Sequence, residues 1–175
     1  MKVRIKFSKQ GYLKFIGHLD VMRYFQKLNR RAGLDLTYTK GFSPHQEMSF
    51  ATPLGLGLTS TAEYADMVFE SLPENAKELI ARMNAVSVPE LQVLDAVLLP
   101  DDAKNAMSIL AGADYVLSFR EGYRPEDPEG FFTKLDEYLG RPSIPVTKKT
   151  KTGTQDVDLK KQIRTYRRLG RNLSP

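Results

Sequence analysis

The chain has 175 residues, of which 41% are hydrophobic and 27% charged, a composition typical of a globular protein with one or two small domains. It contains no cysteine, which excludes disulfides, thiolate metal sites, iron–sulfur ligation and a cysteine nucleophile. The formal charge of +5 is unevenly spread, with +7 on residues 1–50, −10 on residues 51–140 and +8 on residues 141–175.

The first hundred residues predict alternating strands and helices. Residues 3–7 alternate strictly, which predicts a half-buried strand with a basic outer face formed by Lys2, Arg4 and Lys6. A helix is predicted over residues 18–32, ended by Gly33, with a buried stripe of Leu19, Met22, Phe25, Leu28 and Ala32. Further strands are predicted over 34–39, 47–51, 63–70 and 91–99, and a further helix over 75–86. This order is that of a ferredoxin-like split βαβ unit with an extra hairpin, so we expect an α+β domain over residues 1–100.

Residues 101–175 predict a linker and a second, incomplete ferredoxin-like unit. An acidic linker over residues 101–112 is followed by a strand over 113–121 and a short helix over 128–139. Residues 144–159 predict a hairpin that turns at Thr152 and Gly153. The helix and strand that would complete the unit are missing, and residues 160–175 are strongly basic. We therefore expect a second unit over residues 113–175.

Basic side chains at helical spacing form a candidate phosphate-binding surface. They are Arg23, Lys27, Arg30 and Arg31, and arginine suits bidentate phosphate contacts. Lys40 in the following loop has the same sign, as do the hairpin residues Lys148, Lys149 and Lys151. Phe42 in that loop is a candidate for stacking on a base. The two basic blocks favour a polyanionic partner; the alternative is a set of solvated faces with no common partner.

His18, Asp20 and His45 are the candidate catalytic residues. Histidine is the side chain best suited to acid–base chemistry near neutral pH, and both histidines adjoin Gly or Pro turns. We expect the three residues to line one cleft between the helix start and the Gly-Phe-Ser-Pro-His loop. The alternatives are that His18 helps to cap its helix and that His45 satisfies a carbonyl group of the loop. The three residues could also form a facial metal triad, but they do not have the close sequence spacing typical of metal ligands, so no metal site is predicted.

Four segments carry a resemblance to a known family. They are GHLDVMR at 17–23, RRAGLDLTYTKGFSPH at 30–45, SFATPLGLGLTSTAEYAD at 49–66 and KKTKTGTQDVDL at 148–159. Together they resemble the bacterial radical-SAM-linked protein family. The resemblance implies a bacterial cytoplasmic protein that works with a radical SAM protein. That partner, and not this chain, would use S-adenosylmethionine and an iron–sulfur cluster. It also implies a connection with RNA or the ribosome, and a tandem layout similar to the RAMP proteins of CRISPR systems.

Three functions follow as hypotheses. The first is an accessory module, not itself an enzyme, that binds RNA or presents an RNA- or ribosome-related substrate to the radical SAM partner. The second is a metal-independent RNA-processing enzyme that uses His18 and His45 as an acid–base pair. The third is a protein–protein adaptor without nucleic-acid binding. The sequence shows no export signal and no apolar run of roughly 18 residues, so we expect no membrane contact.

Overall fold

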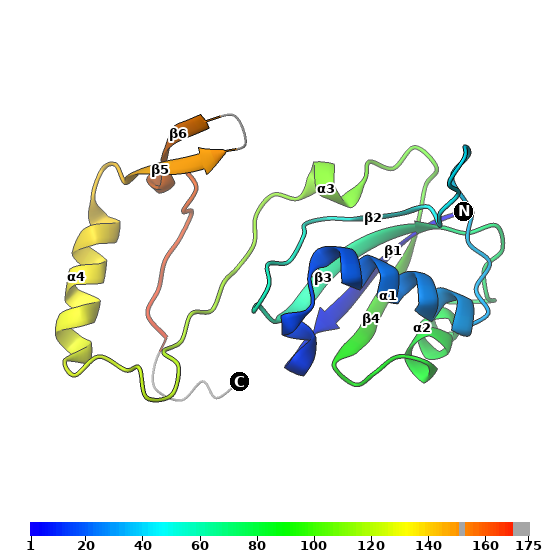
Figure 1. The fold of residues 1–175 in the computed structure, drawn as a ribbon, viewed down its shortest axis with the longest axis horizontal. Coiled ribbons are helices and arrows are strands. Elements are labelled where there is room, and N and C mark those ends of the chain that lie inside the picture. Colours follow the sequence, from blue (N-terminus) through cyan, green and yellow to red (C-terminus); the bar gives the residue numbers. More distant parts are fainter. Residues whose placement is uncertain (151–152, 170–175) are drawn as a thin grey trace. The chain divides into compact units, whose positions relative to one another are not determined.

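The computed structural model in Figure 1 describes residues 1–150 and 153–169. The chain forms two compact units, Met1–Ala113 and Asp114–Pro175. The first basic block of the sequence belongs to the first unit and the last basic block to the second. Both units combine helices with antiparallel strands, so the predicted α+β class is confirmed.

The first unit is built on a four-stranded antiparallel sheet. Its elements are β1 (Lys2–Lys9), the 3-10 turn η1 (Gly11–Phe15), α1 (His18–Arg31), β2 (Met48–Phe50), β3 (Ser60–Val68), α2 (Ala76–Ala85) and β4 (Leu91–Leu99). The strand order is β2-β3-β1-β4. The alternation of β1 turns Val3, Ile5 and Phe7 to one face, where they join the core with residues of both helices. Both helices therefore pack on the same face of the sheet (Figure 1).

The buried side of α1 differs in part from the predicted stripe. Phe25 and Leu28 are buried as expected, but Leu19 is 65% exposed and Val21 is buried in its place. Val21, Phe25 and Leu28 recur at four and three residues and thus form a narrower stripe, whose centre points away from Leu19. Asn29 is also fully buried, although it is polar.

The predicted strand over residues 34–39 is not formed. The segment contributes only two isolated bridges, between Leu36 and Phe69 and between Tyr38 and Gln46. The two bridges join it to different parts of the chain, so no continuous ladder develops. The predicted hairpin strands are otherwise present as β2 and β3, where Phe50 pairs with Ala65.

The opposite face of the sheet holds the segment that was expected to be a linker. Arg4 donates from Nε to Asp66 Oδ1 at 2.7 Å, and the Ala106 amide donates to Asp66 Oδ2 at 2.9 Å. Ala106 begins the short helix α3 (Ala106–Ile109). Lys2 adds a 2.8 Å hydrogen bond from Nζ to the Ala103 carbonyl. Lys2 and Arg4, predicted to form the basic outer face of the first strand, therefore hold residues 103–106 against the sheet.

The second unit contains α4 (Pro128–Gly140), β5 (Pro145–Thr150), β6 (Gly153–Asp158) and the 3-10 turn η2 (Leu159–Lys161). The predicted helix and hairpin strands are thus present. The predicted strand over 113–121 has no regular structure, because no described strand lies beside it to complete a ladder. Phe119 packs edge-to-face against Phe131 of α4, with ring centroids 5.1 Å apart.

Candidate nucleic-acid interface

The four cationic residues predicted on α1 all lie on its exposed side. Arg23, Lys27 and Arg30 follow one another at four and three residues, opposite the buried stripe, and Arg31 lies beside them. Arg23 forms an exposed ion pair with Asp20 at 3.3 Å, which leaves most of its guanidinium in solvent. Arg30 donates from Nε to the Gln26 carbonyl at 3.2 Å. We call Arg23, Lys27, Arg30 and Arg31 the cation stripe.

Residues 38–46 form a closed loop that presents Phe42. The Thr39 amide donates to the His45 carbonyl at 2.9 Å, and Thr39 Oγ1 lies 3.1 Å from His45 Nδ1. His45 Nδ1 also lies 3.3 Å from the Ser43 carbonyl, which agrees with the alternative given for His45 above. Gly41 has a φ of 128°, a conformation open to glycine, and it turns the chain just before Phe42. The Phe42 side chain is 112% exposed, so it projects fully into solvent, next to the exposed Lys40.

Side-chain hydrogen bonds fix this loop to the C-terminal half of α1. The buried Asn29 donates from Nδ2 to Gln46 Oε1 at 3.1 Å. Gln46 in turn donates from Nε2 to the Gln26 carbonyl at 3.3 Å. These bonds hold the base of the loop beside the last turns of α1, the end of the helix that carries Arg30 and Arg31.

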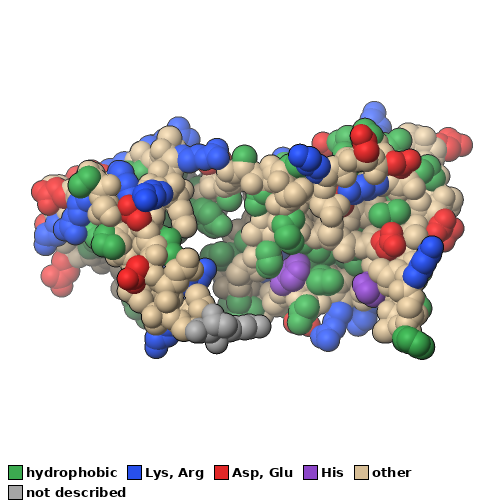
Figure 2. Space-filling model, turned by 90° about the horizontal axis from the view of Figure 1, so that it is seen from above, with side chains coloured by type: hydrophobic (Ala, Val, Ile, Leu, Met, Phe, Trp, Pro, Cys, Tyr) green, Lys and Arg blue, Asp and Glu red, His purple; other side chains and the backbone are tan. Residues whose placement is uncertain are grey.

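The structure does not bring His18, Asp20 and His45 into one cleft. His18 starts α1, whereas the His45 loop is fixed at residues 26 and 29, roughly 12 to 16 Å further along the helix. Figure 2 shows the two histidine side chains, in purple, at separate places with other side chains between them. Asp20 pairs with Arg23 instead. Among the described residues, no group of three His, Cys, Asp or Glu side chains is placed to hold a metal ion.

His18 packs against Phe50, their ring centroids 5.3 Å apart and nearly perpendicular. Together with Lys9 and Glu63 it lines a small cavity of about 10 Å³. That space is enough for about one water molecule. The cavity is thus too small for a nucleotide, and the geometry gives His18 a packing role.

Lys9 is a buried residue of this cavity that sequence reasoning missed. Its side chain is 1% exposed and donates from Nζ to the Ile16 carbonyl at 3.1 Å. Burial lowers the pKa of its ammonium, and the nearby Glu63 charge opposes that effect. Lys9 follows Val3, Ile5 and Phe7 at the same two-residue spacing, so the alternation of β1 turns its side chain toward the core face.

The predicted basic hairpin belongs to the second unit. Lys148 and Lys149 are exposed on β5, opposite Gln155 and Thr154 of β6. Lys151 lies outside the described residues.

Comparison with known proteins shows the family of the chain. A family described as "Uncharacterized protein conserved in bacteria (DUF2344)" matches residues 2–173. A search of curated proteins gave no match to the chain. No helix of the described residues is both long and apolar enough to span a bilayer.

Proposed function

The chain belongs to the bacterial family DUF2344, and we propose that it is an RNA-binding accessory module of a radical SAM protein. The RNA-binding part rests on the cation stripe and the Phe42 loop. The radical SAM part rests on the resemblance of the HLD segment at 18–20 and the GFSPH segment at 41–45. S-adenosylmethionine and an iron–sulfur cluster would belong to the partner, because this chain has no cysteine to ligate a cluster.

The position of Phe42 is the observation that carries the proposal. An aromatic ring exposed at 112% contributes nothing to the core, and it stands on a loop that hydrogen bonds close and anchor. Aromatic side chains stack on unpaired bases without much sequence preference, while neighbouring cations contact phosphates. Phe42 and Lys40 stand on a loop whose base is bonded to Gln26 and Asn29 of α1, the helix that carries the cation stripe.

The fold favours the helix side of the first unit over the sheet side as the RNA surface. The strand order β2-β3-β1-β4 and the order of elements support a ferredoxin-like unit as the finer fold assignment. RNA-binding domains with a four-stranded sheet often stack bases on the open sheet face. Here Lys2 and Arg4 on that face are already bound to residues 103–106, as is Asp66. The four residues of the cation stripe are exposed instead.

Charge reversal on the cation stripe tests the proposal. We expect Lys27→Glu combined with Arg30→Glu to weaken binding of a fluorescein-labelled single-stranded RNA about tenfold or more, measured by anisotropy at low salt. Lys77→Glu, on the exposed side of α2, is the matched control and should bind nearly as tightly as the unaltered chain. Equal affinity of both variants, or no RNA binding by the unaltered chain, would contradict the proposal.

The separation of the two histidines favours binding over an acid–base pair. A pair of catalytic groups must both come within hydrogen-bond reach of the reacting atoms. We therefore expect His18→Ala and His45→Ala to leave any RNA-processing rate unchanged. A bell-shaped pH–rate profile that either substitution abolishes would support the enzyme hypothesis instead.

The partnership needs a separate experiment. A tagged full-length chain drawn from native bacterial lysate should recover a radical SAM protein, identified by mass spectrometry. Recovery of RNA without a radical SAM protein would remove the partner from the proposal and leave the RNA surface standing.

A further inference from the structure

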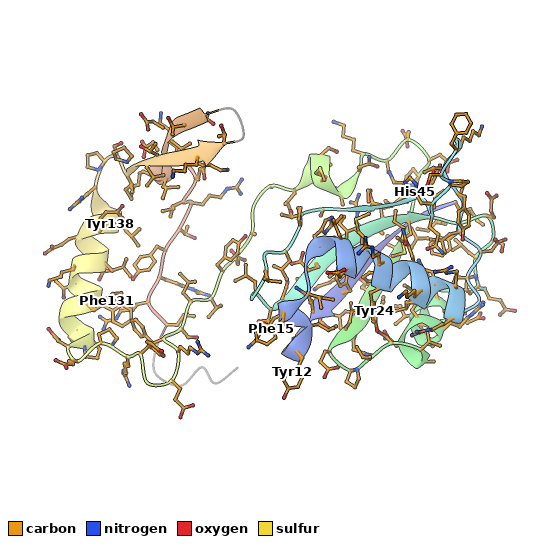
Figure 3. All side chains as sticks on the ribbon, viewed as in Figure 1. Tyr12, Phe15, Tyr24, His45, Phe131 and Tyr138 are labelled. Carbon is orange, nitrogen blue, oxygen red and sulfur yellow. The ribbon has the colours of Figure 1, made fainter. Side chains whose placement is uncertain are left out.

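Two exposed aromatic rings stand at the opposite end of α1 from Phe42. They belong to η1 (Gly11–Phe15), where Tyr12 is 81% exposed and Phe15 is 63% exposed. Figure 3 shows both side chains at the end of the unit where α1 begins, and His45 well apart from them. The Lys14 ammonium lies 5.1 Å from the centre of the Phe15 ring.

The turn that carries these rings is fixed on the body of the unit. Leu13 and Ile16 pack against the core, which directs the intervening side chains outward. The Gly57 amide donates to the Lys14 carbonyl at 2.7 Å, and Lys9 Nζ donates to the Ile16 carbonyl at 3.1 Å. The aromatic rings are therefore presented by an anchored turn, so that little conformational entropy is lost when they bind a flat ligand.

The cation stripe runs between the two sets of aromatic rings. α1 has 14 residues and is thus about 21 Å long. Tyr12 and Phe15 precede its first turn, and the loop with Phe42 is fixed at its last turns. Stacking rings joined by a line of cations are the pattern by which proteins bind an extended single strand, with bases on the rings and phosphates on the cations.

We propose that Tyr12 and Phe15 form a second base-stacking platform, so that single-stranded RNA is held at both ends of α1. This inference rests on the proposed function. It adds the direction in which the RNA runs along α1 and a second place where the RNA is held. The choice of RNA over a protein partner follows from charge, because Lys14 and the cation stripe adjoin the platform and attract phosphates. The exposed Leu19 in the first turn of α1 extends the apolar surface beside the rings.

The test compares Tyr12→Ala combined with Phe15→Ala against the unaltered chain, using a labelled oligouridylate as probe. We expect affinity to fall about tenfold while the dependence of affinity on salt stays the same, since the lost contacts carry no charge. Tyr115→Ala, which removes an exposed ring from the second unit, is the control and should bind as the unaltered chain does. Urea unfolding should confirm that all three proteins are equally stable.

Three results would overturn the inference, and they are distinguishable. If the double variant binds the oligouridylate as tightly as the unaltered chain, the platform is wrong but the RNA surface stands. A double variant that keeps RNA but no longer recovers the radical SAM protein from lysate would assign the rings to a protein partner. If the unaltered chain binds no oligouridylate, both the inference and the proposed function fail.

Discussion

The buried amide of Asn29 donates to the side chain of Gln46 at 3.1 Å and thereby ties the Phe42 loop to the last turns of α1. Asn29 is fully buried, and its amide nitrogen also lies 3.5 Å from the sulfur of Met48. A polar residue in the core is costly unless it is hydrogen-bonded, so this bond matters for stability and for the position of the loop.

Replacing Gln46 by Ala should release the loop. The change leaves the buried Asn29 amide without its oxygen partner, so we expect the free energy of unfolding to fall by about 1–3 kcal/mol. RNA affinity should fall as well, because Phe42 loses its fixed position. Urea denaturation and anisotropy measure the two effects. Gln155→Ala, at an exposed position of β6, is the control, and an equal effect of both substitutions on RNA affinity would contradict the argument.

Replacing Phe42 by Ala should affect binding and not stability. The ring is fully exposed, so its loss removes no core contact, whereas the loss of one stacked base costs about 1–3 kcal/mol of binding free energy. Phe42→Tyr keeps a ring and should retain most of the affinity. If Phe42→Ala binds RNA as well as Phe42→Tyr does, the ring has no part in recognition.

Asp66 should make the first unit sensitive to acid. Burial raises the pKa of this carboxyl. Hydrogen bonds from Arg4 and the Ala106 amide, together with the charges of Arg4 and Lys2, lower it by more, so the net pKa lies below the ordinary value. The unfolded chain therefore binds a proton more readily than the folded chain. The stabilisation that the Asp66 carboxylate gives to the folded chain is present above a pH of about 4, and it is lost as pH falls through the pKa that Asp66 has in the folded chain.

Asp66→Ala should remove this acid dependence and destabilise the protein at neutral pH. The loss is roughly 3 kcal/mol, at the low end for a buried pair, because Arg4 keeps some contact with solvent. Unfolding followed by circular dichroism at pH 3 and pH 7 compares the variant with the unaltered chain. An unchanged difference in stability between the two pH values would show that other carboxyls cause the acid sensitivity.

Lys9 should make the stability of the first unit depend on pH in the alkaline range. Burial lowers the pKa of its ammonium, so between the folded pKa and about 10.4 the unfolded chain binds more protons than the folded chain. Stability should therefore rise with pH in that window. Lys9→Met keeps the volume and removes the charge, and it should abolish this rise in urea titrations at pH 7 and pH 9.5. A rise of the same size in the variant would assign the effect to another group.

The sequence predicts the sheet of the first unit better than its buried polar residues. Alternation identifies the inward face of β1, and helical spacing identifies Phe25 and Leu28. Lys9 continues the two-residue spacing of Val3, Ile5 and Phe7, but its charge is typical of an exposed residue, so its burial was not expected. Leu19 and Val21 are both aliphatic, and only the packing of α1 on the sheet decides which of them is buried.

The candidate site was predicted in its parts but not in its arrangement. The exposed cations and Phe42 follow from spacing and from a turn rich in Gly and Pro. The expected meeting of His18 and His45 was wrong, because the loop is anchored through Asn29 and Gln46, two residues that no motif marks. Tyr12 and Phe15 were missed because no motif marks the short segment between the first predicted strand and the predicted helix.

The dependence of RNA affinity on salt tests the central claim most directly. For a single strand, each phosphate contact contributes about 0.7 to the slope of log affinity against log salt concentration. The unaltered chain should show a steep negative slope, and Lys27→Glu combined with Arg30→Glu should reduce it by about 1.4 or more, whereas Lys77→Glu should leave it unchanged. A slope near zero in the unaltered chain, or the same slope in all three proteins, would contradict an RNA surface on the cation stripe.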